Sequence, residues 1–293
     1  MRILFIGSVQ FSLEMLEHLI ERKADVIGVC TKKSSSFNSD HVDLSLYSEL
    51  NSIPWKLCDD INSPETTSWI RELHPDVIFC FGWSQLIKEE ILKIAPSGVF
   101  GFHPSALPIN RGRHPIIWAL VLGLKETAST FFRIDLGADS GDIISQERVD
   151  INSEDDASSL YRKIVDIAKL QLNAILPKLE SGTIEFHKQS SVSVNYWRKR
   201  SWVDGEIDWR MSAEAIHNLV RGLSAPYPGA HFLYKGIAVK VWKTTVCSAP
   251  SSNIEPGKVF SVMETGPIVK CGLDAIRLIE TEPHFEPAEG EYL

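Results

Sequence analysis

A histidine and an aspartate stand in two short loops, each of which follows a strand-like run of residues. The stretch GFHPSALPINRGRHP (101–115) places His103 directly after apolar residues, in a loop broken by prolines and glycines. The stretch DLGADSGD (135–142) carries three aspartates, one of which is Asp139. Ligands of open α/β sheets bind beyond the carboxyl ends of strands. Two neighbouring strands would therefore bring this imidazole and a carboxylate together.

The chemistry of such a pair is proton transfer or the stabilisation of an oxyanion, because the carboxylate orients the imidazole ring and favours its charged form. The plain alternative is a hydrogen-bonded histidine and an aspartate that serves only its turn. Spacing alone leaves both interpretations open.

The segments around these loops alternate between strand and helix patterns. Buried-strand runs occupy residues 2–7, 25–31, 54–57, 76–81, 99–102, 127–134 and 142–149. The apolar pattern predicts helices over residues 11–21, 44–50, 64–73, 87–94, 115–122 and 155–179. This alternation predicts an α/β N-terminal domain with a Rossmann-like, mostly parallel sheet.

The composition changes after residue 183. Residues 183–210 are polar and rich in tryptophan, and they predict a crossing between domains. A helix is expected over 212–223, and short strands follow at 238–244, 258–262, 268–271 and 275–279. Short strands separated by turn residues predict a small C-terminal β-barrel of the OB-like kind. We therefore expect a catalytic domain over 1–190, a linker over 191–210 and a β-barrel-like domain over 211–293.

The composition of the 293-residue chain argues against several classes of protein. Its net charge of −8 argues against nucleic-acid binding, which needs clustered Lys and Arg. The five cysteines are scattered and predict reduced thiols, and no metal-ligand spacing is present. No apolar run has the length of a membrane span, and MRILFIGS has no signal-peptide pattern, so we expect a cytoplasmic protein without a membrane partner. The first loop, GSVQFS, lacks the glycines of a dinucleotide fingerprint, which argues against a dehydrogenase.

Longer segments of the chain resemble the folate-dependent formyltransferases. The similarity is carried by HPSALP (103–108), RGR (111–113), ETASTFF (126–132) and GADSGDI (137–143). It extends to MRILFIGS at the start, to DVIFCFGWSQLI (76–87), and to WVDGEIDW and IHNLVRGLSAPYPGA within 202–230. The group includes methionyl-tRNA formyltransferase, the formyltransferase half of the bifunctional polymyxin-resistance enzyme, and the sugar N-formyltransferases.

The resemblance implies formyl transfer from N10-formyltetrahydrofolate to an amine. His103 and Asp139 fall on the family's catalytic His and Asp; the first would stabilise the oxyanion, and the second would support it and help to remove the amine proton. The family has an Asn two residues before the His, where this chain has Gly101. Asn110 and His114 are the candidate side chains for the missing hydrogen bond, beside a water or a backbone N–H.

The resemblance also implies where the folate lies. It would lie against residues 81–87 and against the turn at 136–142, and most of its contacts would be made by backbone. The expected folate-binding residues are Gly82, Trp83, Leu86, Ile87, Arg113, Gly137 and Asp142. Trp83 serves equally well as a core residue, and Arg113 as an ordinary surface residue.

Three acceptors compete. The tRNA enzyme of the family carries a basic insertion in its first long loop, whereas KKSSSFNSDH is short and weakly basic. The enzyme for glycinamide ribonucleotide is a single domain. A nucleotide-linked amino sugar, carried by UDP, dTDP or CMP and used for surface polysaccharide, fits the two domains and the missing insertion. The expected substrate-binding residues are Lys32, Lys33, Ser34, Asn38 and Tyr227.

Other classes of function stay open. A formyltetrahydrofolate hydrolase would use water in place of the amine, and Gly101 makes a catalytically silent binding protein conceivable. A homodimer is a further expectation, because exposed strand edges in the C-terminal part could pair.

Overall fold

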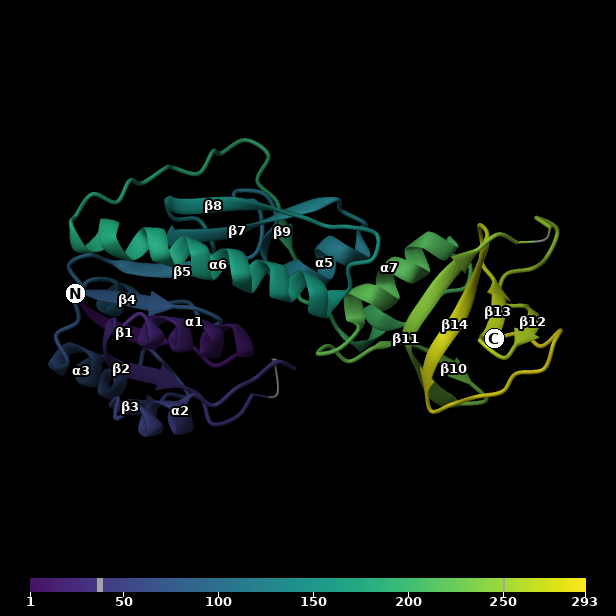
Figure 1. Ribbon diagram of the computed structural model, residues 1–293, viewed down its shortest axis with the longest axis horizontal. Helices are drawn as coiled ribbons and strands as arrows, with labels where there is room; N and C mark the ends of the chain where they lie inside the picture. Colours follow the sequence, from purple (N-terminus) through teal and green to yellow (C-terminus); the bar gives the residue numbers. More distant parts are fainter. Residues whose placement is uncertain (36–38, 250) are drawn as a thin grey trace. The chain divides into compact units, whose positions relative to one another are not determined.

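The computed structural model describes residues 1–35, 39–249 and 251–293. Its contacts divide the chain into two compact units (Figure 1). The first unit comprises Met1–Pro115, Thr127–Val149 and Arg162–Trp197, and the second comprises Ile116–Glu126, Asp150–Tyr161 and Arg198–Leu293. Each unit therefore takes its residues from three separate stretches of the chain.

The first unit is built on a sheet with the strand order β3-β2-β1-β4-β5-β7-β8. These strands are β1 (Arg2–Ile6), β2 (Asp25–Thr31), β3 (Trp55–Leu57), β4 (Val77–Cys80), β5 (Val99–His103), β7 (Glu126–Arg133) and β8 (Ile143–Asp150). The strands from β3 to β5 pair in parallel, and β7 pairs with β5 antiparallel. The predicted mostly parallel sheet is confirmed.

Helices cover this sheet. They are α1 (Gln10–Glu21), α2 (Ser45–Leu50), α3 (Pro64–Glu72), α4 (Glu89–Leu92) and α6 (Ala157–Glu180). α5 (Pro115–Val121) lies in the second unit from Ile116 onward, and Ile117 belongs to the apolar core of that unit. α3 begins where the Ser63 hydroxyl accepts a hydrogen bond from the Thr66 N–H and Pro64 takes the first helical position. α1 and α6 lie side by side along the sheet (Figure 1), where Lys169 Nζ is 2.6 Å from Glu14 Oε2.

The core of the sheet is apolar, as expected of parallel strands with both faces covered. All residues from Ile3 to Ile6 of β1 are buried. The rings of Phe79 and Phe81 stack with centroids 5.2 Å apart, and Phe131 meets Phe81 edge-on at 5.4 Å. This packing fixes the ends of β4 and β5, where the residues of the candidate site begin.

The second unit is an antiparallel sheet with a helix packed on it. The strand order is β10-β11-β14-β13-β12, and α7 (Ala213–Leu223) contacts β11. The strands are β10 (Ala230–Tyr234), β11 (Ile237–Cys247), β12 (Val259–Met263), β13 (Gly266–Lys270) and β14 (Ala275–Glu282). The predicted small C-terminal β domain is confirmed, although β10 was not expected from the sequence. In the described ranges, no helix is both long and apolar enough to cross a membrane.

Candidate active site

His103 and Asp139 lie against each other in the first unit. Nδ1 of His103 is 3.8 Å from Oδ2 of Asp139, and the imidazole is buried. The two loops were expected at the same edge of the sheet, but β7 is antiparallel to β5. In this pairing Phe100 lies opposite Arg133, and His103 lies opposite Thr130. The turn after β7 therefore begins beside the start of β5, and it is Asp139, further along this turn, that reaches the imidazole.

The two nitrogens of His103 have different surroundings. Nε2 is 2.9 Å from the backbone oxygen of Asn110, so Nε2 carries a proton and donates it to this carbonyl. In the neutral ring, Nδ1 is then the unprotonated nitrogen, and it faces the Asp139 carboxylate. A proton placed at Nδ1 would turn this approach into an ion pair.

The three aspartates of the turn, Asp135, Asp139 and Asp142, make different hydrogen bonds. Asp135 organises the turn, because its Oδ1 accepts hydrogen bonds from Gly137 N at 3.0 Å and from Ser140 Oγ at 2.7 Å. Asp142 contributes its backbone oxygen, which accepts from Arg133 N at 2.8 Å. Asp139 has a φ of +54°, and its Oδ2 accepts from Gly112 N at 3.0 Å. The carboxylate that faces His103 is thus held by a backbone amide.

Gly101 has no room for a side chain. A Cβ added there would lie 2.9 Å from Cζ of Phe132 and 3.0 Å from Cγ1 of Ile134. Apolar atoms fill the space that an asparagine would need at this position. Of the two candidate replacements, Asn110 contacts His103 through its backbone oxygen, while its side-chain oxygen accepts from Asn195 Nδ2 at 3.0 Å. His114 has a left-handed φ of +56° in the same loop.

Residues 189–197 hold the loop that follows β5. The short strand β9 (Tyr196–Trp197) pairs in parallel with β6 (Arg111–Gly112). Asn195 Oδ1 accepts from Asn110 N at 2.8 Å. This segment was not expected to belong to the site, because its sequence shows only Gln and Asn in a polar stretch.

Comparison with known proteins identifies the family. Residues 1–176 match the formyl transferase family, and residues 201–288 match the C-terminal domain of formyl transferases. The chain belongs to the formyl transferase family. The predicted resemblance is confirmed over both units.

Solved structures of formyl transferases share the fold. One is WlaRD, described as a sugar 3N-formyl transferase in the presence of dTDP and 5-N-formyl-THF. It is 20% identical, the match covers 97% of this chain and 99% of WlaRD, and the TM-score is 0.70. Another is an N-formyltransferase from Helicobacter canadensis in complex with folinic acid and dTDP-3-aminofucose, at 21% identity, 94% and 98% coverage and a TM-score of 0.71. A third is methionyl-tRNA formyltransferase from Clostridium thermocellum. Its identity is 20%, the match covers 84% of this chain and 94% of that protein, and the TM-score is 0.62.

In this formyl transferase, the side chain of Asn62 holds the end of the segment that is expected to contact the folate. Asn62 donates to the backbone oxygen of Leu86 at 2.9 Å and accepts from Lys88 N at 2.8 Å. The Leu86 side chain is 61% exposed, whereas Ile87 is 3% exposed and belongs to the core. The Ile87 side chain is therefore a packing residue, and only its backbone remains for a ligand.

Trp83 and Lys32 meet beside this segment. The Lys32 ammonium lies 4.9 Å from the centroid of the Trp83 ring, so a residue expected for the sugar nucleotide touches one expected for the folate. Nε1 of Trp83 is buried and has no hydrogen-bond partner within the described ranges. The indole therefore has a donor available, and the backbone of Gly82 before it has a φ of +65°.

The remaining expected residues are spread over the formyl transferase. Lys33 and Ser34 are exposed after β2, and Asn38 lies outside the described residues. Arg113 is exposed, and its backbone N–H donates to Trp197 O at 3.0 Å. Tyr227 packs against the apolar core of the second unit.

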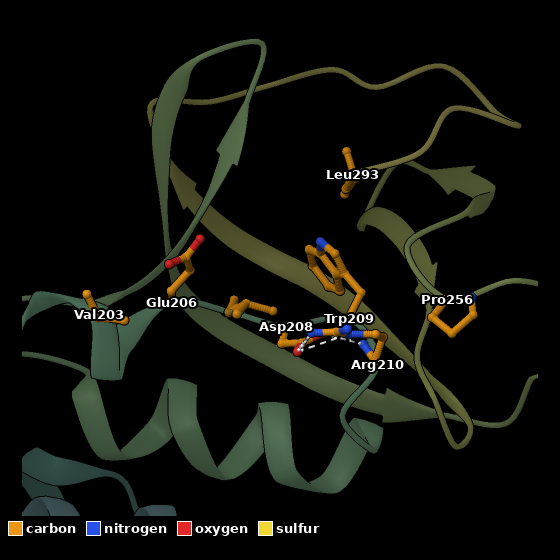
Figure 2. Close-up of a pocket in the computed structure, with 8 residues that line it drawn as sticks. Val203, Glu206, Asp208, Trp209, Arg210, Pro256 and Leu293 are labelled. Atoms are coloured by element: carbon orange, nitrogen blue, oxygen red, sulfur yellow. Dashed lines mark hydrogen bonds and ion pairs between the residues drawn. The ribbon is translucent and has the colours of Figure 1, made fainter.

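A cavity of about 590 Å³ lies in the second unit (Figure 2). It is lined by Val203, Glu206, Ile207, Asp208, Trp209, Arg210, Pro256 and Leu293. Arg210 forms an ion pair with Asp208 at 2.6 Å and lowers the pKa of that carboxyl to about 2, so the two charges satisfy each other. The cavity includes none of the expected site residues. Over the described part of the chain, no group of three or more His, Cys, Asp and Glu side chains is placed to hold a metal ion.

Proposed function

We propose that the protein transfers a formyl group from N10-formyltetrahydrofolate to the amino group of a nucleotide-linked amino sugar. The observation that carries the proposal is the approach of His103 Nδ1 to Asp139 Oδ2 in a chain of the formyl transferase family. Two structures of the same fold were determined with dTDP or a dTDP-linked amino sugar, which supports this acceptor class and favours dTDP over UDP and CMP as the carrier.

The residues of the first unit fit a folate. Trp83 offers an apolar ring and a buried N–H that has no partner in the described part of the chain, and Leu86 adds an exposed apolar side chain. Flat heteroaromatic ligands are bound by surfaces of this kind, with a few polar groups that fix their orientation. N10-formyltetrahydrofolate supplies the formyl group and takes up one proton at N10.

His103 and Asp139 together accept the proton that the amine loses and later deliver it to N10. The amine loses a proton as its nitrogen bonds to the formyl carbon, and the unprotonated Nδ1 and the Asp139 carboxylate form the site that receives it. Protonated His103 is then the positive group beside the negative charge that develops on the formyl oxygen. The proton returns to N10 as the old carbon–nitrogen bond breaks, so the pair ends as it began.

Charge supports a sugar nucleotide over an initiator tRNA. The chain has a net charge of −8, and a tRNA acceptor would need a basic surface to neutralise its phosphates. Lys32, which lies over Trp83, is well suited to one diphosphate group. The formylated sugar of this reaction would be a building block for surface polysaccharide.

The test is a direct search for product. The purified protein is incubated with N10-formyltetrahydrofolate and dTDP-, UDP- or CMP-linked amino sugars, and mass spectrometry follows the gain of one formyl group. Formylation of a dTDP-linked sugar in preference to the others is the expected result. Formate released without any acceptor would assign a hydrolase, and formylation of methionyl-tRNA in place of any sugar would overturn the proposal.

A further inference from the structure

One glutamine connects the two loops of the candidate site. Nε2 of Gln189 donates to the backbone oxygens of Asp139 at 2.9 Å and Gly141 at 2.7 Å. Its Oε1 accepts from Arg111 Nε at 3.1 Å and from Arg111 Nη2 at 2.6 Å. Both ends of the amide are therefore used, one on the aspartate turn and the other on the loop after β5.

These contacts close a ring of hydrogen bonds. Arg111 is followed by Gly112, whose N–H donates to Oδ2 of Asp139 at 3.0 Å. The path from the Asp139 backbone through Gln189, Arg111 and Gly112 thus returns to the Asp139 carboxylate. The same loop presents the Asn110 oxygen to Nε2 of His103 at 2.9 Å. The orientation of both members of the pair depends on this ring.

The ring holds groups that would not adopt these positions alone. Asp139 has a φ of +54°, a left-handed conformation that residues other than glycine adopt less readily, so contacts from its surroundings help to hold it. Arg111 is buried, and its Nη1 donates to the hydroxyl of Tyr196 at 2.9 Å. Because Gln189 and Tyr196 are neutral, they fix the guanidinium without cancelling its positive charge.

We propose that Gln189 is a positioning residue for the reaction: it sets the distance and orientation of Asp139 relative to His103 while touching neither substrate. This inference rests on the proposed function for its kinetic consequence, and on the hydrogen-bond ring alone for its structural consequence. The two consequences are measured separately.

The kinetic experiment compares two glutamines. Gln189→Met keeps the length of the side chain but removes every hydrogen bond, and we expect kcat to fall about 100-fold with a change in KM below about threefold. Gln189→Glu keeps the acceptors for Arg111 but has no N–H for the two carbonyls, and the same fall is expected. The control is Gln171→Met, because Gln171 is a buried amide that donates to Ser129 O at 3.1 Å and Ser145 Oγ at 2.8 Å. This control should lose stability but keep its kcat.

The structural experiment is independent of activity. Amide hydrogen exchange at Gly112, whose N–H is bonded to Asp139, is followed by NMR in the full chain. We expect faster exchange in Gln189→Met and unchanged exchange in Gln171→Met. If the wild-type protein formylates no sugar, the proposed function fails while the exchange at Gly112 still tests Gln189. Unchanged exchange at Gly112, or a kcat that falls no further than in the Gln171 control, would overturn the inference.

Discussion

Gly101 lies directly opposite Phe132 across the β5–β7 pair, and Phe132 occupies the space into which a side chain at residue 101 would extend. The family resemblance implies an asparagine at this position, where this chain has apolar atoms in place of an amide. The proposed pair of His103 and Asp139 is therefore expected to work without a side-chain donor from residue 101.

A methyl group at residue 101 should destabilise the protein. Gly101→Ala would place Cβ 2.9 Å from Phe132, and we expect the free energy of unfolding to fall by about 1–3 kcal/mol, as measured by urea denaturation. The double variant Gly101→Ala with Phe132→Leu should lose less than the sum of the single variants. Strict additivity would show that the two residues do not crowd each other.

An asparagine at residue 101 should not improve the enzyme. Gly101→Asn must displace Phe132 and Ile134, which pack beside β5, so we expect lower stability and no gain in kcat. The assay is steady-state formyl transfer. A large rise in turnover would mean that the native site is not adapted to glycine.

Removal of either member of the pair should stop the reaction. His103→Ala and Asp139→Asn are each expected to lower kcat by about 10²–10⁴-fold, because proton transfer and oxyanion stabilisation both depend on them. The matched control is Asp208→Asn, which changes an aspartate of the second unit that is already paired with Arg210. Thermal unfolding verifies that the variants are folded, and a near-normal rate would remove the altered residue from the mechanism.

Trp83→Phe should separate binding from stability. The indole N–H is buried and has no hydrogen-bond partner among the described residues, so its removal should cost no hydrogen bond, and phenylalanine keeps an aromatic ring against the core. If this N–H orients the folate, KM for N10-formyltetrahydrofolate should rise about tenfold with little change in kcat. A normal KM together with reduced stability would instead assign Trp83 to the core.

The second unit should become less stable as the pH falls below neutrality. Burial lowers the pKa of His231 from 6.5, its Nδ1 has no partner within the described ranges, and its ring stacks on Trp202 at 3.7 Å. Because the unfolded chain takes up a proton first, this stability is complete above pH 6.5 and is lost as the pH falls towards the folded pKa. His231→Phe keeps a stacked ring, so melting temperatures of the variant should fall less between about pH 8 and pH 5 than those of the wild type. An identical pH dependence in both proteins would contradict this.

The sequence predicted local features well and distant partnerships poorly. β2 was predicted at both ends, because Asp25–Thr31 combines a buried apolar run with clear polar borders. β10 was missed because Ala230–Tyr234 follows a proline-rich turn and includes His231. Gln189 was missed for another reason. It acts across 50 residues to Asp139 and 78 residues to Arg111, and no local pattern records such contacts.

The motifs predicted that His103 and Asp139 lie close together, although the expected strand geometry was wrong. The expectation used the carboxyl ends of two neighbouring strands, whereas β7 is antiparallel to β5. Strand direction is set by how the chain crosses the sheet, and apolar periodicity is the same for both directions.

The second unit is assembled from three separate stretches of the chain, which limits how it can be engineered. Arg198 accepts, through its backbone oxygen, a hydrogen bond from Trp118, and Gly222 lies close to Leu120 and Val121. Residues 198–293 are thus completed by short stretches embedded far upstream, at 116–126 and 150–161. A graft of the C-terminal segment alone onto another protein would leave these surfaces bare. An exchange of the second unit therefore has to carry residues 116–126 and 150–161 together with residues 198–293.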